Sequence, residues 1–246
     1  MTRFLEVDAL RGTAVLFMVI YHFAFDWNFF VSAIPGFYAG FWVYFARATA
    51  AAFVALAGLS TTLYANRKRE SGSEWKPVLK RGAFIFLLGM AITFFTFLAF
   101  PAYAIFFGVL HLMGLSIVLG IPFLRRPRVA ALAGILIAGI GILFYQPGMQ
   151  GVLPFVPVLL PGGVQSFDYV PLLPWFGVFL LGMALGNYFY PNGNPIKGLG
   201  WEQGNVWVQL LARVGRKSLA IYLVHQPVLV GVLLAGGFAE WNALAP

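Results

Sequence analysis

The chain contains no cysteine. This absence excludes disulfide bridges, cysteine-ligated metal sites and a thiol nucleophile, so covalent chemistry would have to use His, Asp, Glu, Ser, Thr, Tyr or Lys. Charged residues are also scarce: they make up 10% of the 246 residues, whereas 61% are apolar. That composition excludes an ordinary soluble globular domain and is typical of polytopic membrane proteins. We expect one integral membrane domain over residues 1–246.

Seven apolar stretches are each close to the roughly 20 residues that a helix needs to cross a bilayer. They predict an all-α, polytopic transmembrane helix bundle of about seven spans: Ala9 to Phe30, Phe41 to Tyr64, Lys80 to Phe100, Phe106 to Leu124, Val129 to Tyr145, Leu172 to Tyr190, and Lys217 to Phe238. The first stretch is long and lacks a small-residue cleavage site after a short core, so we expect it to stay as a span.

The net charge of +8 is distributed along the chain in a pattern that argues against a nucleic-acid partner. All the Lys and Arg residues except Arg47 fall in alternate segments between spans, or at the span ends that face those segments. Under the positive-inside rule this predicts a cytoplasmic N-terminus and a C-terminus outside. The outer segment Gln146 to Pro171 contains no Lys or Arg and is rich in Pro and Gly but apolar, which predicts a lid or re-entrant segment.

The first stretch carries ionisable residues along one side. Steps of three or four residues keep side chains on one face of a helix. Such steps link Asp8, Arg11, Val15, Met18, His22 and Asp26. The helical rise puts His22 about 16 Å beyond Arg11, and Asp26 one turn further, where it could accept a ring N–H and fix the tautomer of His22. Ionisable groups in lipid are costly and mark function, although Asp8 and Arg11 could also form a local pair at the helix start.

Two other histidines lie inside apolar stretches. His111 falls in the fourth stretch and His225 near the middle of the seventh, followed by Gln226 and Pro227. Because proline has no N–H, the helix can open locally beside His225 and expose a backbone carbonyl. A satisfied interhelical hydrogen bond is the alternative role for each histidine.

Arg47 is the single cation placed in the outer half of the predicted bundle. It cannot reach the cytoplasm and needs a carboxylate, for which Asp26 and Asp168 are the natural partners. The same geometry could instead hold an acceptor molecule or polarise an acyl carbonyl.

Four segments together resemble the transmembrane acyltransferase superfamily, especially small prokaryotic relatives of the heparan-alpha-glucosaminide N-acetyltransferase catalytic domain. They are RFLEVDALRGTAVLFMVIYH, in which ten residues separate Arg11 from His22, FGVLHLMG, DYVPLLPWFG and GRKSLAIYLVHQP. The resemblance implies transfer of an acyl group, in particular acetyl, from cytoplasmic acyl-coenzyme A to a membrane or extracytoplasmic acceptor such as a sugar amine or hydroxyl. It implies a place in the plasma membrane of a prokaryote. The chain is shorter than the larger family members and we expect no appended soluble domain, which leaves the acceptor unspecified.

On this reading His22 acts as general base or as nucleophile, and Asp26 orients it. The donor brings several phosphates, which Arg binds well. The candidate donor-binding residues are Arg11, Asp8, Lys80, Arg81, Arg125, Arg126 and Arg216. The basic ones could alternatively set topology and hold anionic lipid headgroups. The candidate acceptor-binding residues are Arg47, His111, Asp168, Trp175, His225 and Gln226.

Two rival functions use the same residues. A small-molecule or proton-coupled transporter could employ the His and Asp groups as a relay. A haem or metal protein could use histidines from different helices as ligands, but no pair has a diagnostic spacing and we expect no metal. The oligomeric state, including a homodimer, is left open.

Overall fold

The computed structural model describes residues 4–67, 74–144, 166–196 and 205–238. All regular structure within these ranges is helical, which confirms the predicted all-α class. The α-helices are α1 Leu5–Phe30, α2 Phe41–Arg67, α3 Trp75–Ala99, α4 Val109–Leu119, α5 Pro127–Phe144, α6 Leu172–Phe189, α7 Val206–Arg216 and α8 Ser218–Ala235, with short 3₁₀ turns η2 Pro101–Tyr103, η3 Ile121–Phe123 and η4 Pro191–Gly193. Six of the helices in the described ranges are long and apolar enough to cross a membrane: α1, α2, α3, α5, α6 and α8.

The fourth predicted span differs from the other six. Its apolar residues form α4, which has 11 residues, followed at once by the turn η3. Gly108 is extended before α4, and Pro122 lies within η3, so the helix ends well short of a bilayer's width. Most of the predicted outer lid, namely residues 146–165 of the segment 146–171, lies outside the described residues. The predicted orientation of the termini stays a prediction.

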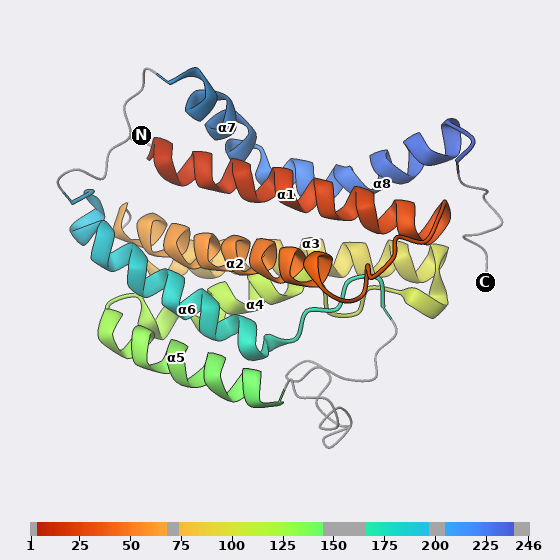
Figure 1. The fold of residues 1–246 in the computed structure, drawn as a ribbon. Helices are drawn as coiled ribbons and strands as arrows, with labels where there is room; N and C mark the ends of the chain where they lie inside the picture. The colour runs from red at the N-terminus through yellow and green to blue at the C-terminus, as the bar shows by residue number, and fades with distance from the viewer. Residues whose placement is uncertain (1–3, 68–73, 145–165, 197–204, 239–246) are drawn as a thin grey trace. The chain divides into compact units, whose positions relative to one another are not determined.

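The chain divides into two compact units (Figure 1). The first comprises residues 1–53 and 197–246, and so contains α1, the start of α2, α7 and α8. The second comprises residues 54–196 and contains the rest of α2 together with α3, α4, α5 and α6.

Helix α1 is the centre of the first unit and packs against both α7 and α8. The crossing with α7 is a contact between backbones. A Cβ atom at Gly12 would overlap the carbonyl of Leu211, and one at Gly215 would overlap the carbonyl of Asp8. Small residues at a helix crossing are the usual means of close approach in membrane proteins, where apolar burial alone gives little drive for association.

In the second unit, α3 packs on α4 and α5 packs on α6, again through small residues. Gly134 of α5 lies against the backbone of Gly177 in α6, and Gly89 of α3 lies against the ring of His111. The large side chains of α3 and α5 point outward instead; Phe84, Leu87, Leu132 and others are more than half exposed. Helices with this pattern bury their small faces in protein and offer their large apolar faces to lipid.

Candidate active site

Two histidines face each other within the first unit. His22 lies in the second half of α1 and His225 in the middle of α8. Their ring centroids are 4.7 Å apart and the ring planes are inclined by 82°, an edge-to-face arrangement. The structure thus brings together two residues that the sequence placed on separate spans.

Both imidazoles adopt the same tautomer. The Nδ1 atom of His22 lies 2.9 Å from the carbonyl oxygen of Met18, and Nδ1 of His225 lies 2.7 Å from that of Tyr222. A carbonyl oxygen only accepts hydrogen bonds, so each Nδ1 has to carry the hydrogen. In the neutral rings, Nε2 then holds the lone pair. The site therefore contains two adjacent basic nitrogens of fixed orientation.

Asp26 does not set this tautomer, and the prediction that it accepts a ring N–H from His22 is wrong. The carbonyl of Met18 already occupies the protonated nitrogen of His22. Asp26 instead accepts a hydrogen bond of 2.7 Å from Nε2 of Gln226, which connects α1 to α8 beside His225.

Two buried acceptor atoms stand out at this connection. Within the described residues, neither Oδ2 of Asp26 nor Oε1 of Gln226 has a hydrogen-bond partner. The Asp26 side chain is essentially inaccessible, because the residue is 1% exposed. Buried acceptors of this kind require an N–H or O–H donor. The connection is therefore suited to a ligand that donates hydrogen bonds.

The expected opening of the seventh span does not occur. Helix α8 runs without interruption from Ser218 to Ala235 and includes Pro227. The backbone acceptor used near His225 is the carbonyl of Tyr222, which the imidazole itself engages.

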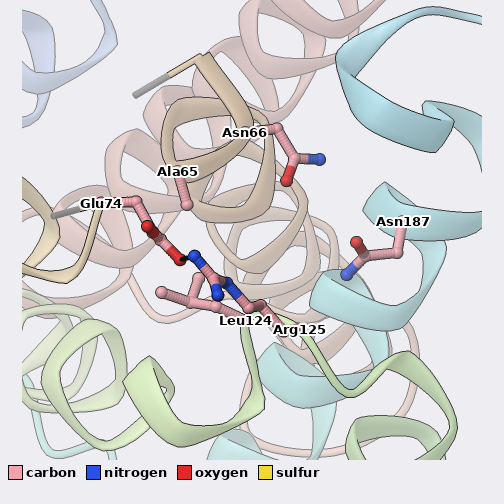
Figure 2. Close-up of a pocket in the computed structure, with 6 residues that line it drawn as sticks. All are labelled: Ala65, Asn66, Glu74, Leu124, Arg125 and Asn187. Atoms are coloured by element: carbon pink, nitrogen blue, oxygen red, sulfur yellow. Dashed lines mark ion pairs between the residues drawn. The ribbon is translucent and has the colours of Figure 1, made fainter. Parts of the chain in front are cut away.

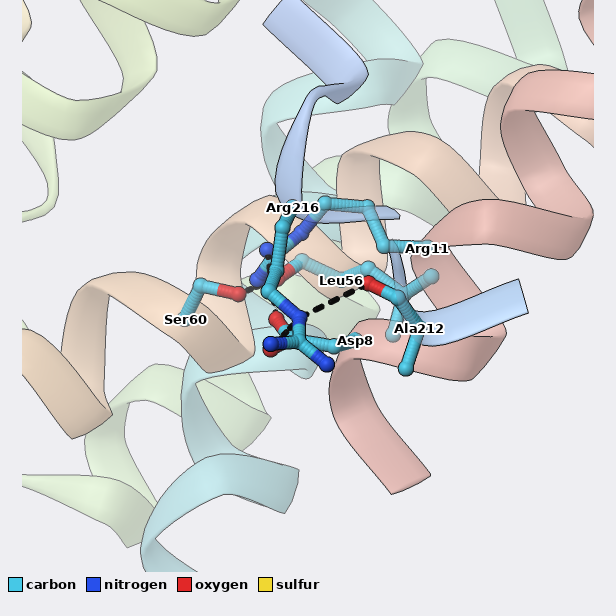
Figure 3. A network of polar contacts seen from close by, with 6 residues as sticks. All are labelled: Asp8, Arg11, Leu56, Ser60, Ala212 and Arg216. Carbon is cyan, nitrogen blue, oxygen red and sulfur yellow. Dashed lines mark hydrogen bonds and ion pairs between the residues drawn. The ribbon is translucent and has the colours of Figure 1, made fainter. Parts of the chain in front are cut away.

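A charged cluster lies toward the start of α1 (Figure 3). Asp8 accepts a hydrogen bond of 3.0 Å from Arg11 and lies 3.9 Å from Nε of Arg216, which also donates to the carbonyl of Ala212 at 3.2 Å. One carboxylate is shared by two guanidinium groups, so the cluster keeps a net positive charge. The Arg216 side chain is 41% exposed and that of Arg11 24%, which leaves donors accessible to a phosphate. The structure therefore brings together Asp8, Arg11 and Arg216, and their role in donor binding stays a prediction.

His111 has a different environment in the second unit. Its Nδ1 accepts a hydrogen bond of 3.2 Å from the Gly108 N–H, and its Nε2 lies 3.2 Å from Oγ1 of Thr93. Because the Thr93 hydroxyl donates to the carbonyl of Ile105, it accepts from His111. Asp168 accepts from the Val109 N–H at 3.0 Å, so both predicted residues cap the start of α4.

The remaining predicted donor-binding residues lie in the second unit. Lys80 and Arg81 belong to α3, and the guanidinium of Arg81 lies 5.4 Å from the ring centroid of Tyr64. Arg125 and Arg126 lie between η3 and α5. Of the predicted acceptor-binding residues, Trp175 lies on α6 of the second unit and Arg47 on the part of α2 that belongs to the first.

Arg125 borders a polar cavity of about 130 Å³ (Figure 2). It forms an ion pair there with Glu74, a buried residue that the sequence analysis did not single out. The other lining residues are Ala65, Asn66, Leu124 and Asn187. The ion pair joins the start of α3 to the start of α5 and so has a structural use of its own.

Sequence reasoning also missed the carbonyls of Met18 and Tyr222. They lie four and three residues before their histidines, so the signal was present in the chain. A backbone carbonyl of the preceding turn is within reach of a polar side chain in any helix.

The model of the heparan-alpha-glucosaminide N-acetyltransferase catalytic family matches residues 3–227. That range runs through both units and contains every site residue named above. No curated protein and no solved structure matches the chain.

Proposed function

We propose that the chain, which belongs to the heparan-alpha-glucosaminide N-acetyltransferase catalytic family, transfers an acetyl or other acyl group from cytoplasmic acyl-coenzyme A. The family gives the chain a membrane acetyltransferase-type function. The acceptor is an amine or a hydroxyl presented from the membrane or from its outer side, and the membrane is the plasma membrane of a prokaryote.

The pair of imidazoles carries this proposal. With hydrogens on Nδ1, His22 and His225 offer lone pairs on Nε2 within one site. As the lone pair of the acceptor nitrogen or oxygen attacks the thioester carbonyl carbon, Nε2 of His22 removes the acceptor's proton. The carbon–sulfur bond breaks, and the thiolate of coenzyme A leaves and takes up a proton.

A covalent route uses the same atoms. Nε2 of His22 attacks the thioester, coenzyme A leaves, and the resulting acyl-imidazole transfers the acyl group to the acceptor. In this route the second imidazole, His225, is placed to remove the acceptor's proton. Both routes need an unprotonated Nε2 on His22, and the tautomer set by Met18 supplies it.

The charged cluster of Asp8, Arg11 and Arg216 supports binding of an acyl donor that carries phosphates. Two guanidinium groups on one carboxylate leave a positive charge and accessible donors for the phosphates of coenzyme A. Arg11 and His22 share a face of α1 and are about 16 Å apart along the helix axis. The extended pantetheine arm of the donor suits such a separation between phosphates and thioester.

The buried hydrogen-bond acceptors on Asp26 and Gln226 support an acyl acceptor that is an amine or a hydroxyl. Oδ2 of Asp26 and Oε1 of Gln226 can each receive a hydrogen bond from an amine or hydroxyl. An acceptor held by these atoms would lie beside the imidazole pair, because Gln226 is the neighbour of His225 and Asp26 lies one turn from His22.

The test is to incubate the purified protein with acetyl-coenzyme A that carries a labelled acetyl group, in the presence of amine or hydroxyl acceptors. We expect labelled product and free coenzyme A from the wild type, and neither from His22→Ala. The variant should stay folded, because the hydrogen bond that His22 makes within the described residues is to its own helix, and the lost contacts with the rings of Tyr21 and His225 should lower the melting temperature only modestly. A folded His22→Ala protein with wild-type turnover would refute the assignment, and label retained on His22 would select the covalent route.

A further inference from the structure

Helix α7 presents three different faces although it has only 11 residues. One face is covered by α1: Ala212 and Gly215 are buried, and the backbone of Leu211 touches Gly12. A second face is polar and carries Gln209, Arg213 and Arg216. At about 100° per residue, Gln209, Arg213 and Arg216 lie within about 60° of one another around the helix.

The third face is apolar and exposed. Val206 is 58% exposed, Trp207 72% and Leu210 42%. Helix α7 begins in a defined way, because Oδ1 of Asn205 accepts hydrogen bonds from the Trp207 and Val208 N–H groups. These apolar side chains therefore stand on a formed helix.

This combination does not suit a membrane span. Eleven residues rise about 16 Å, roughly half the thickness of the hydrocarbon core. The polar face could not be placed in lipid without leaving Gln209 and Arg213 in hydrocarbon. A helix with an apolar face rich in Trp and Leu and basic residues on its polar side is typical of the plane of a membrane surface.

The charge of the segment indicates which lipids it meets. Residues 206–217 contain Arg213, Arg216 and Lys217 and no acidic residue. Arg216 is engaged with Asp8, but Arg213 and Lys217 are exposed at the end of the helix, one turn apart. Anionic headgroups attract such residues.

We propose that α7 lies in the plane of the membrane surface. Val206, Trp207 and Leu210 insert at the boundary between headgroups and acyl chains, and Arg213 and Lys217 bind anionic phospholipid headgroups. This inference does not depend on acyl transfer.

The absence of cysteine makes a direct test possible, since a single introduced cysteine labels one position only. Trp207→Cys, Leu210→Cys and, as a matched control, Gln209→Cys would each carry an environment-sensitive fluorophore in the full chain, reconstituted in nanodiscs of phosphatidylcholine and phosphatidylglycerol. We expect lipid nitroxides at shallow depth to quench the labels at 207 and 210 several-fold more than the label at 209. A water-soluble quencher should act in the opposite order.

Three results would overturn the placement: equal access of water to all three labels, stronger quenching at 207 and 210 by deep nitroxides than by shallow ones, or shielding of both labels from lipid and water alike.

A second measurement, which needs no labels, tests whether Arg213 and Lys217 bind anionic headgroups. We expect phosphatidylglycerol to raise the melting temperature of the wild type above its value in pure phosphatidylcholine, and the double variant Arg213→Gln/Lys217→Gln to lose that increase. The charge-conserving variant Arg213→Lys/Lys217→Arg should keep it. An increase in the neutralised variant equal to that of the wild type would refute binding of anionic lipid by these residues.

Discussion

The three histidines of the chain are divided between two regions that use the imidazole in opposite ways. In the first unit, His22 and His225 hold hydrogens on Nδ1, which leaves the lone pair of each neutral ring on Nε2. In the second unit, His111 receives a hydrogen bond at Nδ1 and donates one from Nε2 to Thr93. The same side chain is a candidate for proton transfer in one region and a helix cap in the other. The difference lies in the backbone group that meets Nδ1, which is a carbonyl at His22 and His225 and an N–H at His111.

The surroundings of the two regions reinforce this difference. The polar groups around His111 satisfy one another: Gly108, Thr93, Ile105 and Asp168 all have partners. Beside His22 and His225, Oδ2 of Asp26 and Oε1 of Gln226 are buried and have no hydrogen-bond partner within the described residues. Incomplete satisfaction of buried polar groups is unfavourable for stability unless a bound molecule supplies the missing hydrogen bonds.

The largest effect is expected from removing the paired imidazoles. His22→Ala and His225→Ala should each lower kcat/KM by about 10²–10⁴-fold, the range for a positioned acid or base. The double variant should be little worse than the more damaging single variant, because the two rings act in one step. Steady-state release of coenzyme A measures this. Losses that multiply in the double variant would show that the rings act independently.

Removing His111 should affect stability instead. We expect His111→Ala to lower the free energy of unfolding by about 2–3 kcal/mol, because it leaves a cavity and unpaired groups at Gly108 and Thr93. The melting temperature reports this loss, and the activity per folded molecule should stay near that of the wild type. Thr93→Val, which removes the two hydrogen bonds of the hydroxyl but leaves no large cavity, should cost about 1–2 kcal/mol. Inactivity of His111→Ala at an unchanged melting temperature would contradict a structural role.

A smaller effect is expected in the charged cluster. Arg216→Gln should raise KM for acyl-coenzyme A about tenfold, which corresponds to about 1.4 kcal/mol for a charge-assisted bond to phosphate. It should leave KM for acyl-pantetheine unchanged, since that donor lacks the nucleotide. Arg128→Gln, an exposed cation of α5, is the matched control. An equal rise in KM for both donors would place Arg216 elsewhere in the mechanism.

Much of α1 could be predicted from the sequence, because helix geometry alone decides which of its residues share a face. The predicted stripe is largely buried, as Asp8, Val15, Met18 and Asp26 show. The partners across the helix interface could not be predicted in the same way. Asp26 had several candidate partners, and the choice of Gln226 depends on the packing of α1 against α8.

The length of α4 marks another limit of sequence reasoning. Apolar composition predicts burial or lipid contact over Phe106 to Leu124, but it does not report where a helix ends. Gly108 and Pro122 are local signals for the two ends. Whether such signals end a helix or bend it depends on tertiary contacts, and here the His111 and Asp168 caps favour the shorter helix.

The contact between Gly12 and Gly215 has a consequence for the neighbouring arginines. Each glycine is adjacent in sequence to one of them, Arg11 or Arg216, so the gap between the two positive charges is governed by how closely two main chains touch. A single added methyl group at either glycine would force the helices apart. The spacing of this charged pair could thus be changed without altering any charged residue, which makes the helix crossing a means of tuning affinity for anions.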